Sequence, residues 1–125
     1  MRKNHSRIAT IEVGRGTGTA LEALREDFAR AWKTRPYRGE RFGFESPAAL
    51  FRTLTPKRWE LIEALQAAGP LTQRALARVL ARDVKNVHSD AVALLDVGLI
   101  EKTADGKLIV PFDEIRAGFV LRSAA

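Results

Sequence analysis

Residues 71–100 read LTQRALARVLARDVKNVHSDAVALLDVGLI and contain the clearest structural signals of the chain. Thr72 has the side chain and the position of a helix N-cap, which predicts a helix over residues 73–80. After a turn over residues 81–83, a longer helix is predicted over residues 84–97, with a glycine behind it. The stretch therefore predicts two helices joined by a tight turn.

Apolar residues recur in this stretch at the spacing that packed helices require. Ala77 is small enough to let the two helices cross closely. The side chains that we expect to be buried are Leu76, Leu80, Val87, Ala91, Leu94 and Leu95. We interpret these positions as structural.

Two pairs of a capping residue and a proline stand upstream, at Ser46–Pro47 and Thr55–Pro56. Proline is favoured at the first helical position, so the pairs predict helices over residues 47–54 and 56–68, the second ended by Gly69. This second helix is expected to bury Trp59, Leu61, Ile62 and Leu65.

Downstream of the long helix the pattern changes to short runs suited to strands. The Asp-Gly pair at 105–106 is a strong turn signal and predicts a hairpin over residues 99–110. Residues 114–122 alternate between apolar and other side chains, which predicts a further strand.

The N-terminal third has a different organisation. Residues 7–13 are rich in β-branched side chains and predict a strand, and residues 41–45 predict a short extended piece. Between them, GRGTG at 14–18 is interpreted as a flexible turn rather than a dinucleotide site, because Thr19 stands where the third glycine is needed. A helix over residues 20–33 is predicted to carry an apolar face made of Leu21, Leu24, Phe28 and Trp32.

The composition favours a globular protein with acidic partners. Lys plus Arg is 21 against 15 Asp plus Glu, which gives a formal charge of +6, with a pI near 10.3. The absence of cysteine excludes disulfides, thiolate zinc sites and cysteine nucleophiles, and it fits a cytoplasmic location. The sequence shows no catalytic motif or metal-ligand cluster, so we expect no enzyme activity, metal or cofactor.

The order of helices, tight turn and hairpin is that of a winged helix-turn-helix. Residues 71–100 resemble the winged-helix transcriptional regulators of the MarR and ArsR type. Residues 55–65 and 83–90 resemble small prokaryotic predicted DNA-binding regulators, a class that can serve as antitoxins. The resemblance implies an α+β, mainly α fold, with a DNA-binding domain over residues 46–122. Residues 1–45 would be a strand-helix extension for dimerisation or partner binding.

Under this resemblance the first helix of the motif lies across the phosphate backbone. Arg74, Arg78 and Arg82 recur four apart and would form a basic stripe beside Thr72, with Asp83 as the only acid nearby. A solvated arginine face is the alternative. The motif usually has glycine where Ala81 stands, and a left-handed alanine costs roughly 1 kcal/mol.

The second helix of the motif would enter the major groove with its N-terminal half. The side chains expected to read bases there are Lys85, Asn86, His88 and Ser89. His88 has three open readings: an exposed base contact, a phosphate donor, or a half-buried residue that is hydrogen-bonded within the fold. Asp83 is expected to cap this helix rather than to read bases.

The hairpin would be the wing, with Lys102 and Lys107 on either side of its tip. Glu101 and Asp105 cancel these charges, so the wing could touch DNA or serve only for packing. The sequence thus predicts a sequence-specific regulator that binds double-stranded DNA, acting as a dimeric repressor. The alternative is an antitoxin or protein-interaction module with weak or no DNA binding.

Overall fold

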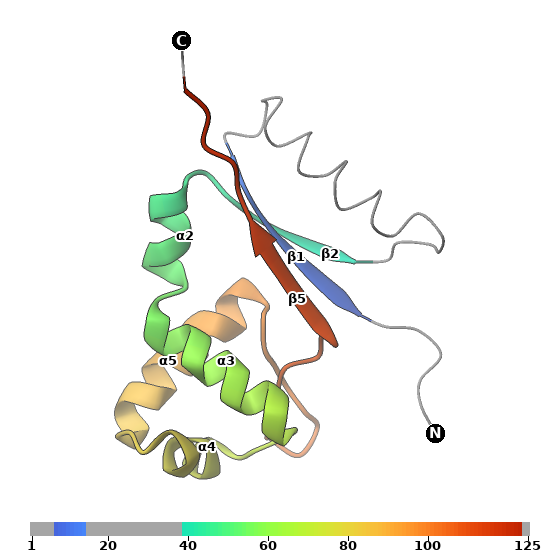
Figure 1. Cartoon of the computed structure of the whole chain (residues 1–125). Coiled ribbons are helices and arrows are strands. Elements are labelled where there is room, and N and C mark those ends of the chain that lie inside the picture. Colours follow the sequence, from blue (N-terminus) through green and yellow to red (C-terminus); the bar gives the residue numbers. More distant parts are fainter. Residues whose placement is uncertain (1–6, 15–38, 124–125) are drawn as a thin grey trace. The chain divides into compact units, whose positions relative to one another are not determined.

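A computed structural model of the chain describes residues 7–14 and 39–123. In these ranges the helices are α2 (Pro47–Thr53), α3 (Pro56–Ala68), α4 (Gln73–Leu80) and α5 (Val84–Val97). The strands are β1 (Ile8–Val13), β2 (Glu40–Phe44), β3 (Glu101–Lys102), β4 (Leu108–Ile109) and β5 (Glu114–Gly118) (Figure 1). The predicted α+β class is confirmed. Two predictions fall outside the described residues. They are the turn at 14–18, apart from Gly14, and the helix over 20–33 with its apolar face of Leu21, Leu24, Phe28 and Trp32.

The chain divides into two compact units, one of residues 1–50 with 112–125 and one of residues 51–111. The described part of the first unit is a three-stranded sheet in the order β2–β1–β5, and both pairings are parallel (Figure 1). All six residues of β1 are buried, which suits the central strand of a parallel sheet. The three strands were predicted, but their pairing into one sheet was not.

Aromatic and charged side chains join the strands of this sheet at one end. The guanidinium of Arg7 donates to the carboxylate of Glu40 at 2.7 Å and lies over the ring of Phe112, 5.0 Å from its centre. Phe42 meets the same ring edge-on, with 5.9 Å between ring centres. These contacts connect β2 to the segment before β5 across the start of β1.

The second unit is built on α3, α4 and α5, which begin and end at the predicted residues. Thr55 and Thr72 cap α3 and α4, because each hydroxyl accepts a hydrogen bond from the backbone N–H three residues on, at 3.3 and 3.1 Å. The buried side chains of these helices are Leu61, Ile62, Leu65, Leu76, Ala77, Val87, Ala91 and Leu94. Trp59, Leu80 and Leu95 were predicted to be buried but are half-buried, so they lie at the border of this core.

The predicted hairpin is confirmed as β3 and β4, which pair antiparallel, with Gly106 in a left-handed conformation at the tip (φ 85°). The hairpin does not stand alone. Leu108 exchanges two backbone hydrogen bonds with Leu71, at 2.8 and 3.1 Å, directly before α4. The base of the hairpin is therefore fixed to the start of α4. No helix in the described ranges is long and apolar enough to cross a membrane.

Candidate nucleic-acid interface

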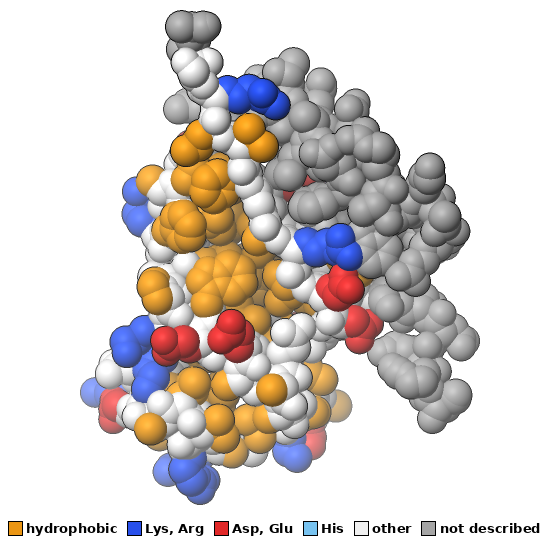
Figure 2. Space-filling model, in the orientation of Figure 1, with side chains coloured by type: hydrophobic (Ala, Val, Ile, Leu, Met, Phe, Trp, Pro, Cys, Tyr) orange, Lys and Arg blue, Asp and Glu red, His pale blue; other side chains and the backbone are white. Residues whose placement is uncertain are grey.

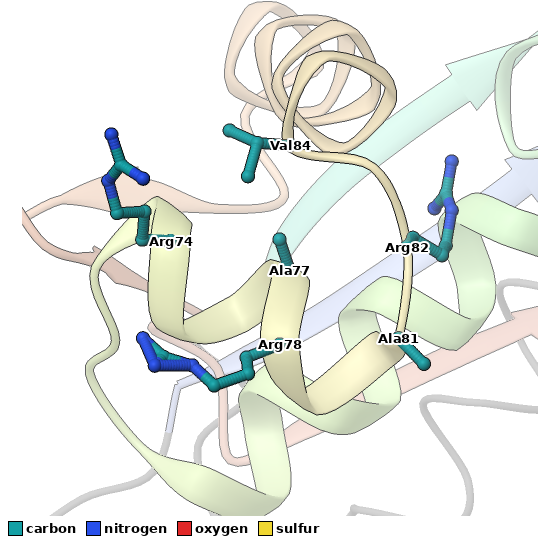
Figure 3. A pocket seen from close by; sticks show the side chains of 6 residues that line it. All are labelled: Arg74, Ala77, Arg78, Ala81, Arg82 and Val84. Atoms are coloured by element: carbon teal, nitrogen blue, oxygen red, sulfur yellow. The ribbon is translucent and has the colours of Figure 1, made fainter.

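Two arginines stand out from α4. Arg74 and Arg78 lie one helical turn apart and are both exposed, and neither forms an ion pair with a carboxylate of the described residues. In Figure 3 the Arg74 side chain extends upward from the start of α4, and the Arg78 side chain extends to the left below it. Lys and Arg side chains protrude at the lower end of the view in Figure 2, where α4 lies in Figure 1. Guanidinium groups held in this way can bind phosphate oxygens through two hydrogen bonds each.

An open hollow of about 510 Å³ lies beside these arginines. Its lining consists of Arg74, Ala77, Arg78, Ala81, Arg82 and Val84 (Figure 3). The uncharged lining residues are small and apolar, and the charged ones are all arginines. The hollow therefore combines apolar side chains with the cationic side chains of Arg74 and Arg78.

Arg82 does not belong to the predicted stripe. It follows Ala81, whose left-handed backbone (φ 55°, ψ 46°) ends α4, and its side chain points away from Arg78 in Figure 3. Arg82 donates to the Asp90 carboxylate at 2.8 Å, and its side chain is 15% exposed. The prediction was wrong because it continued the helical spacing past the end of the helix and overlooked a carboxylate on the next one.

Asp90 joins three parts of the second unit. Its carboxylate accepts hydrogen bonds from Arg58 at 2.9 Å and from Arg82 at 2.8 Å, while Arg58 also donates to the Thr53 carbonyl. Burial acts to raise the pKa of Asp90, but the hydrogen bonds and positive charges of the two arginines outweigh it and lower the pKa below its ordinary value. The network fixes α5 to α3 and to the turn after α4.

The first two turns of α5 present a polar surface. All four side chains expected to read bases, Lys85, Asn86, His88 and Ser89, are exposed. The first turn contains no acidic residue, and Asp83 occupies the N-cap position without making the expected side-chain capping bond. The opposite face of α5 is anchored by Val87, Ala91 and Leu94 in the core. The polar face is thus held outward on a packed support.

His88 combines exposure with a hydrogen bond inside the fold. Its Nδ1 atom lies 3.0 Å from the side-chain oxygen of Gln73, the first residue of α4. This contact connects α5 to the start of α4. The hydrogen bond within the fold that one reading of His88 expected is present, but the residue is exposed and not half-buried.

Asn86 and Ser89 border a second open hollow, of about 580 Å³, whose other lining residues are Thr55, Lys57, Arg58, Arg82, Asp83 and Asp90. Lys57 is exposed in the first turn of α3 and was not among the predicted site residues. The signal was present in the sequence, since a lysine directly after the Thr55–Pro56 helix start must lie at that N-terminus. Lys57 adds a cation beside the polar face of α5.

The wing candidates differ in what surrounds them. Lys102 is exposed on β3, whereas the Lys107 ammonium lies 3.9 Å from the Asp105 carboxylate. The hydroxyl of Thr103 donates to the same carboxylate, and this hydrogen bond is the main reason that the pKa of Asp105 is lowered. The hairpin tip therefore carries a fixed negative charge beside Lys107, and Lys102 is its more accessible cation. In the described ranges, no three His, Asp or Glu side chains gather as metal ligands would.

Comparison with known proteins gives one match. No curated protein and no solved structure matches the chain. The model of the HVO_A0114 family matches residues 53–117, just over half of the chain. The match begins at the last residue of α2, spans the whole three-helix unit and hairpin, and ends within β5. The chain belongs to the HVO_A0114 family.

Proposed function

We propose that the protein is a sequence-specific transcriptional regulator that binds double-stranded DNA. In this proposal α4, the turn and α5 act as a helix-turn-helix, and the β3–β4 hairpin acts as its wing. The observation that carries it is the exposed polar surface on the first two turns of α5, next to two arginines of α4 that have no carboxylate partner in the described residues.

The side chains of α5 suit the edges of base pairs. A major groove is about 12 Å wide and admits one α-helix. Asn86 can donate to and accept from adenine, Lys85 can donate to guanine, and Ser89 can bond to either base. No acidic side chain in the first turn of α5 would oppose the approach of DNA.

Cations on two other helices suit the phosphates on either side of that groove. Arg74 and Arg78 extend from α4, and Lys57 lies at the start of α3. Contacts of this kind fix the position of a protein on DNA but carry no sequence information by themselves. Arg82 takes no part in this role, because its charge is paired with Asp90.

Dimerisation, repression and the antitoxin alternative stay predictions. They rest on the apolar face predicted for residues 20–33 and on the resemblance, and that face lies outside the described residues. The proposed DNA-binding surface, in contrast, lies within the described residues.

The proposal is tested by incubating the purified protein with fragments of its own genome at two salt concentrations and sequencing the bound DNA. We expect a small set of fragments to be enriched at both concentrations, because base contacts persist when phosphate contacts weaken. Recovery of all fragments in equal amounts, or of none, would reject sequence-specific binding.

A paired-variant experiment tests the surface itself. Arg74→Ala/Arg78→Ala and Arg52→Ala/Arg122→Ala both remove two positive charges, but only the first pair belongs to the proposed interface. Arg52 and Arg122 are exposed, on α2 and on the segment after β5. We expect the first pair to lower affinity for an enriched fragment by at least tenfold and the second to change it little. Equal losses would mean that only overall charge matters.

A further inference from the structure

Val84 is an apolar residue at the centre of a cationic surface. It is the first residue of α5 and is 38% exposed. It lines the same hollow as Arg74 and Arg78, and in Figure 3 its side chain points to the side on which Arg74 extends. Single exposed valines are common, so exposure alone has no functional meaning. As the first residue of α5, this valine belongs to the end of the helix that is proposed to enter the major groove.

Only one of the four bases offers an apolar group in the major groove. Thymine carries a C5-methyl group there, and proteins recognise it through contact with apolar side chains. Arg74 and Arg78, which line the hollow, suit the phosphates, while Val84, which lines it too, is 38% exposed, so its methyl groups are accessible. With α5 in the major groove, the Val84 side chain would contact a thymine methyl group at the edge of that groove.

We infer that Val84 contacts the C5-methyl group of a thymine and thereby makes the protein prefer an A·T pair at that position of its site. The inference rests on the proposed function, because it requires α5 to lie in the major groove. It adds a specificity-determining residue to the polar set, and it predicts that removing one methyl group from the DNA weakens binding.

The same helix offers a matched control. Val92 is also an exposed valine, at 41%, but it lies eight residues further along α5, about 12 Å at 1.5 Å per residue. It does not line the hollow beside Arg74 and Arg78. Val84→Ala and Val92→Ala remove the same atoms from similarly exposed positions on α5. A change in DNA binding seen only in Val84→Ala is therefore due to the position of Val84 and not to the loss of apolar surface in general.

The test uses an enriched genomic fragment made in two forms, one with thymine and one with deoxyuridine, which pairs identically but lacks the methyl group. Equilibrium binding of both duplexes is measured by fluorescence anisotropy. For the wild-type chain we expect deoxyuridine to weaken binding about fourfold for the contacted methyl group, which corresponds to about 0.8 kcal/mol for a buried CH₂-sized group. Single replacements along the fragment then locate the thymine.

The variants decide the assignment. We expect Val84→Ala to bind both duplexes nearly equally, Val84→Ile to keep the preference for thymine, and Val92→Ala to keep the full fourfold difference. A preference unchanged in Val84→Ala, or lost in Val92→Ala instead, would overturn the inference and leave the proposed function intact. If the wild-type chain binds neither duplex above a scrambled control, the proposed function fails and the inference fails with it. Thermal unfolding of each variant confirms that the chain is folded.

Discussion

Among single residues, Ala81 is the one whose side chain fits its backbone conformation least well. It is the one non-glycine residue of the described chain with positive φ, and this conformation ends α4. A left-handed backbone brings the alanine Cβ close to a carbonyl oxygen, at a cost of about 1–2 kcal/mol. The strain is tolerated because the turn places α5 against α4.

Ala81→Gly is therefore expected to stabilise the protein. Relief of strain exceeds the extra entropy that glycine loses on folding, so the free energy of unfolding should rise by up to about 1 kcal/mol. Chemical denaturation measures the change. Ala64→Gly, in the middle of α3, is the matched control and should lower the same free energy by about 1 kcal/mol. A decrease for Ala81→Gly would contradict the strain argument.

Asp90 gives a prediction that depends on pH. Asp90→Asn removes the negative charge that two partly buried arginines share, and one of them, Arg82, already has a buried nitrogen, Nη1, without a hydrogen-bond partner in the described structure. We expect a loss of about 1–3 kcal/mol in the free energy of unfolding at neutral pH, since the charges of two partly buried guanidiniums are left uncompensated.

The pH dependence of this loss follows from the lowered pKa. A carboxylate whose pKa is lower in the folded than in the unfolded chain contributes stability above its unfolded value, near 3.8, and loses it as the pH falls through the folded value. The difference between wild type and Asp90→Asn should be constant from about pH 6 to 8 and shrink below about pH 4. Denaturation curves across this range provide the measurement. A difference that grew in acid would show that the two arginines do not stabilise the ionised carboxylate.

At the scale of elements, α4 and α5 have separate proposed tasks. Arg74 and Arg78 of α4 would contact phosphates, whereas Asn86 of α5 would contact a base. Phosphate contacts release counterions from DNA and therefore depend on salt, while a base contact acts mainly on sequence preference.

Salt titration distinguishes the two tasks. Each phosphate contact contributes about 0.9 to the slope of log affinity against log salt concentration. For Arg74→Ala/Arg78→Ala the slope should decrease by about 2, with sequence preference retained. For Asn86→Ala the slope should stay the same, while discrimination at one base pair falls by about 1–3 kcal/mol. If both variants lowered the salt slope and the sequence preference to the same extent, α4 and α5 would not have the separate roles proposed for them.

At the scale of the whole molecule, the sequence specified local structure far better than contacts between distant segments. The starts of α3 and α4 follow from Thr55 and Thr72, and the ends of α3 and α5 from Gly69 and Gly98, because caps act within a few residues. The parallel pairing of β5 with β1 joins residues about a hundred positions apart, and no local pattern encodes such a partner.

The candidate site shows the same division. The exposure of Lys85, Asn86 and Ser89 follows from the positions of the apolar residues on α5, so periodicity was sufficient to predict it. The pairing of Arg82 with Asp90 depends on where the chain turns after Ala81. That turn is a property of the packed unit, which is why the predicted stripe of three arginines was one too long.

The central claim is that the exposed face of α5 reads DNA sequence. The most direct measurement compares the affinity of Lys85→Ala/Asn86→Ala/Ser89→Ala and of the wild-type chain for an enriched genomic fragment and for a scrambled duplex of the same composition. We expect the wild-type chain to prefer the genomic fragment by a factor of about 10³ or more. In the triple variant this preference should fall below about tenfold, the remainder being the contribution of Val84, with thermal stability nearly unchanged. A triple variant that keeps the wild-type preference would contradict the account.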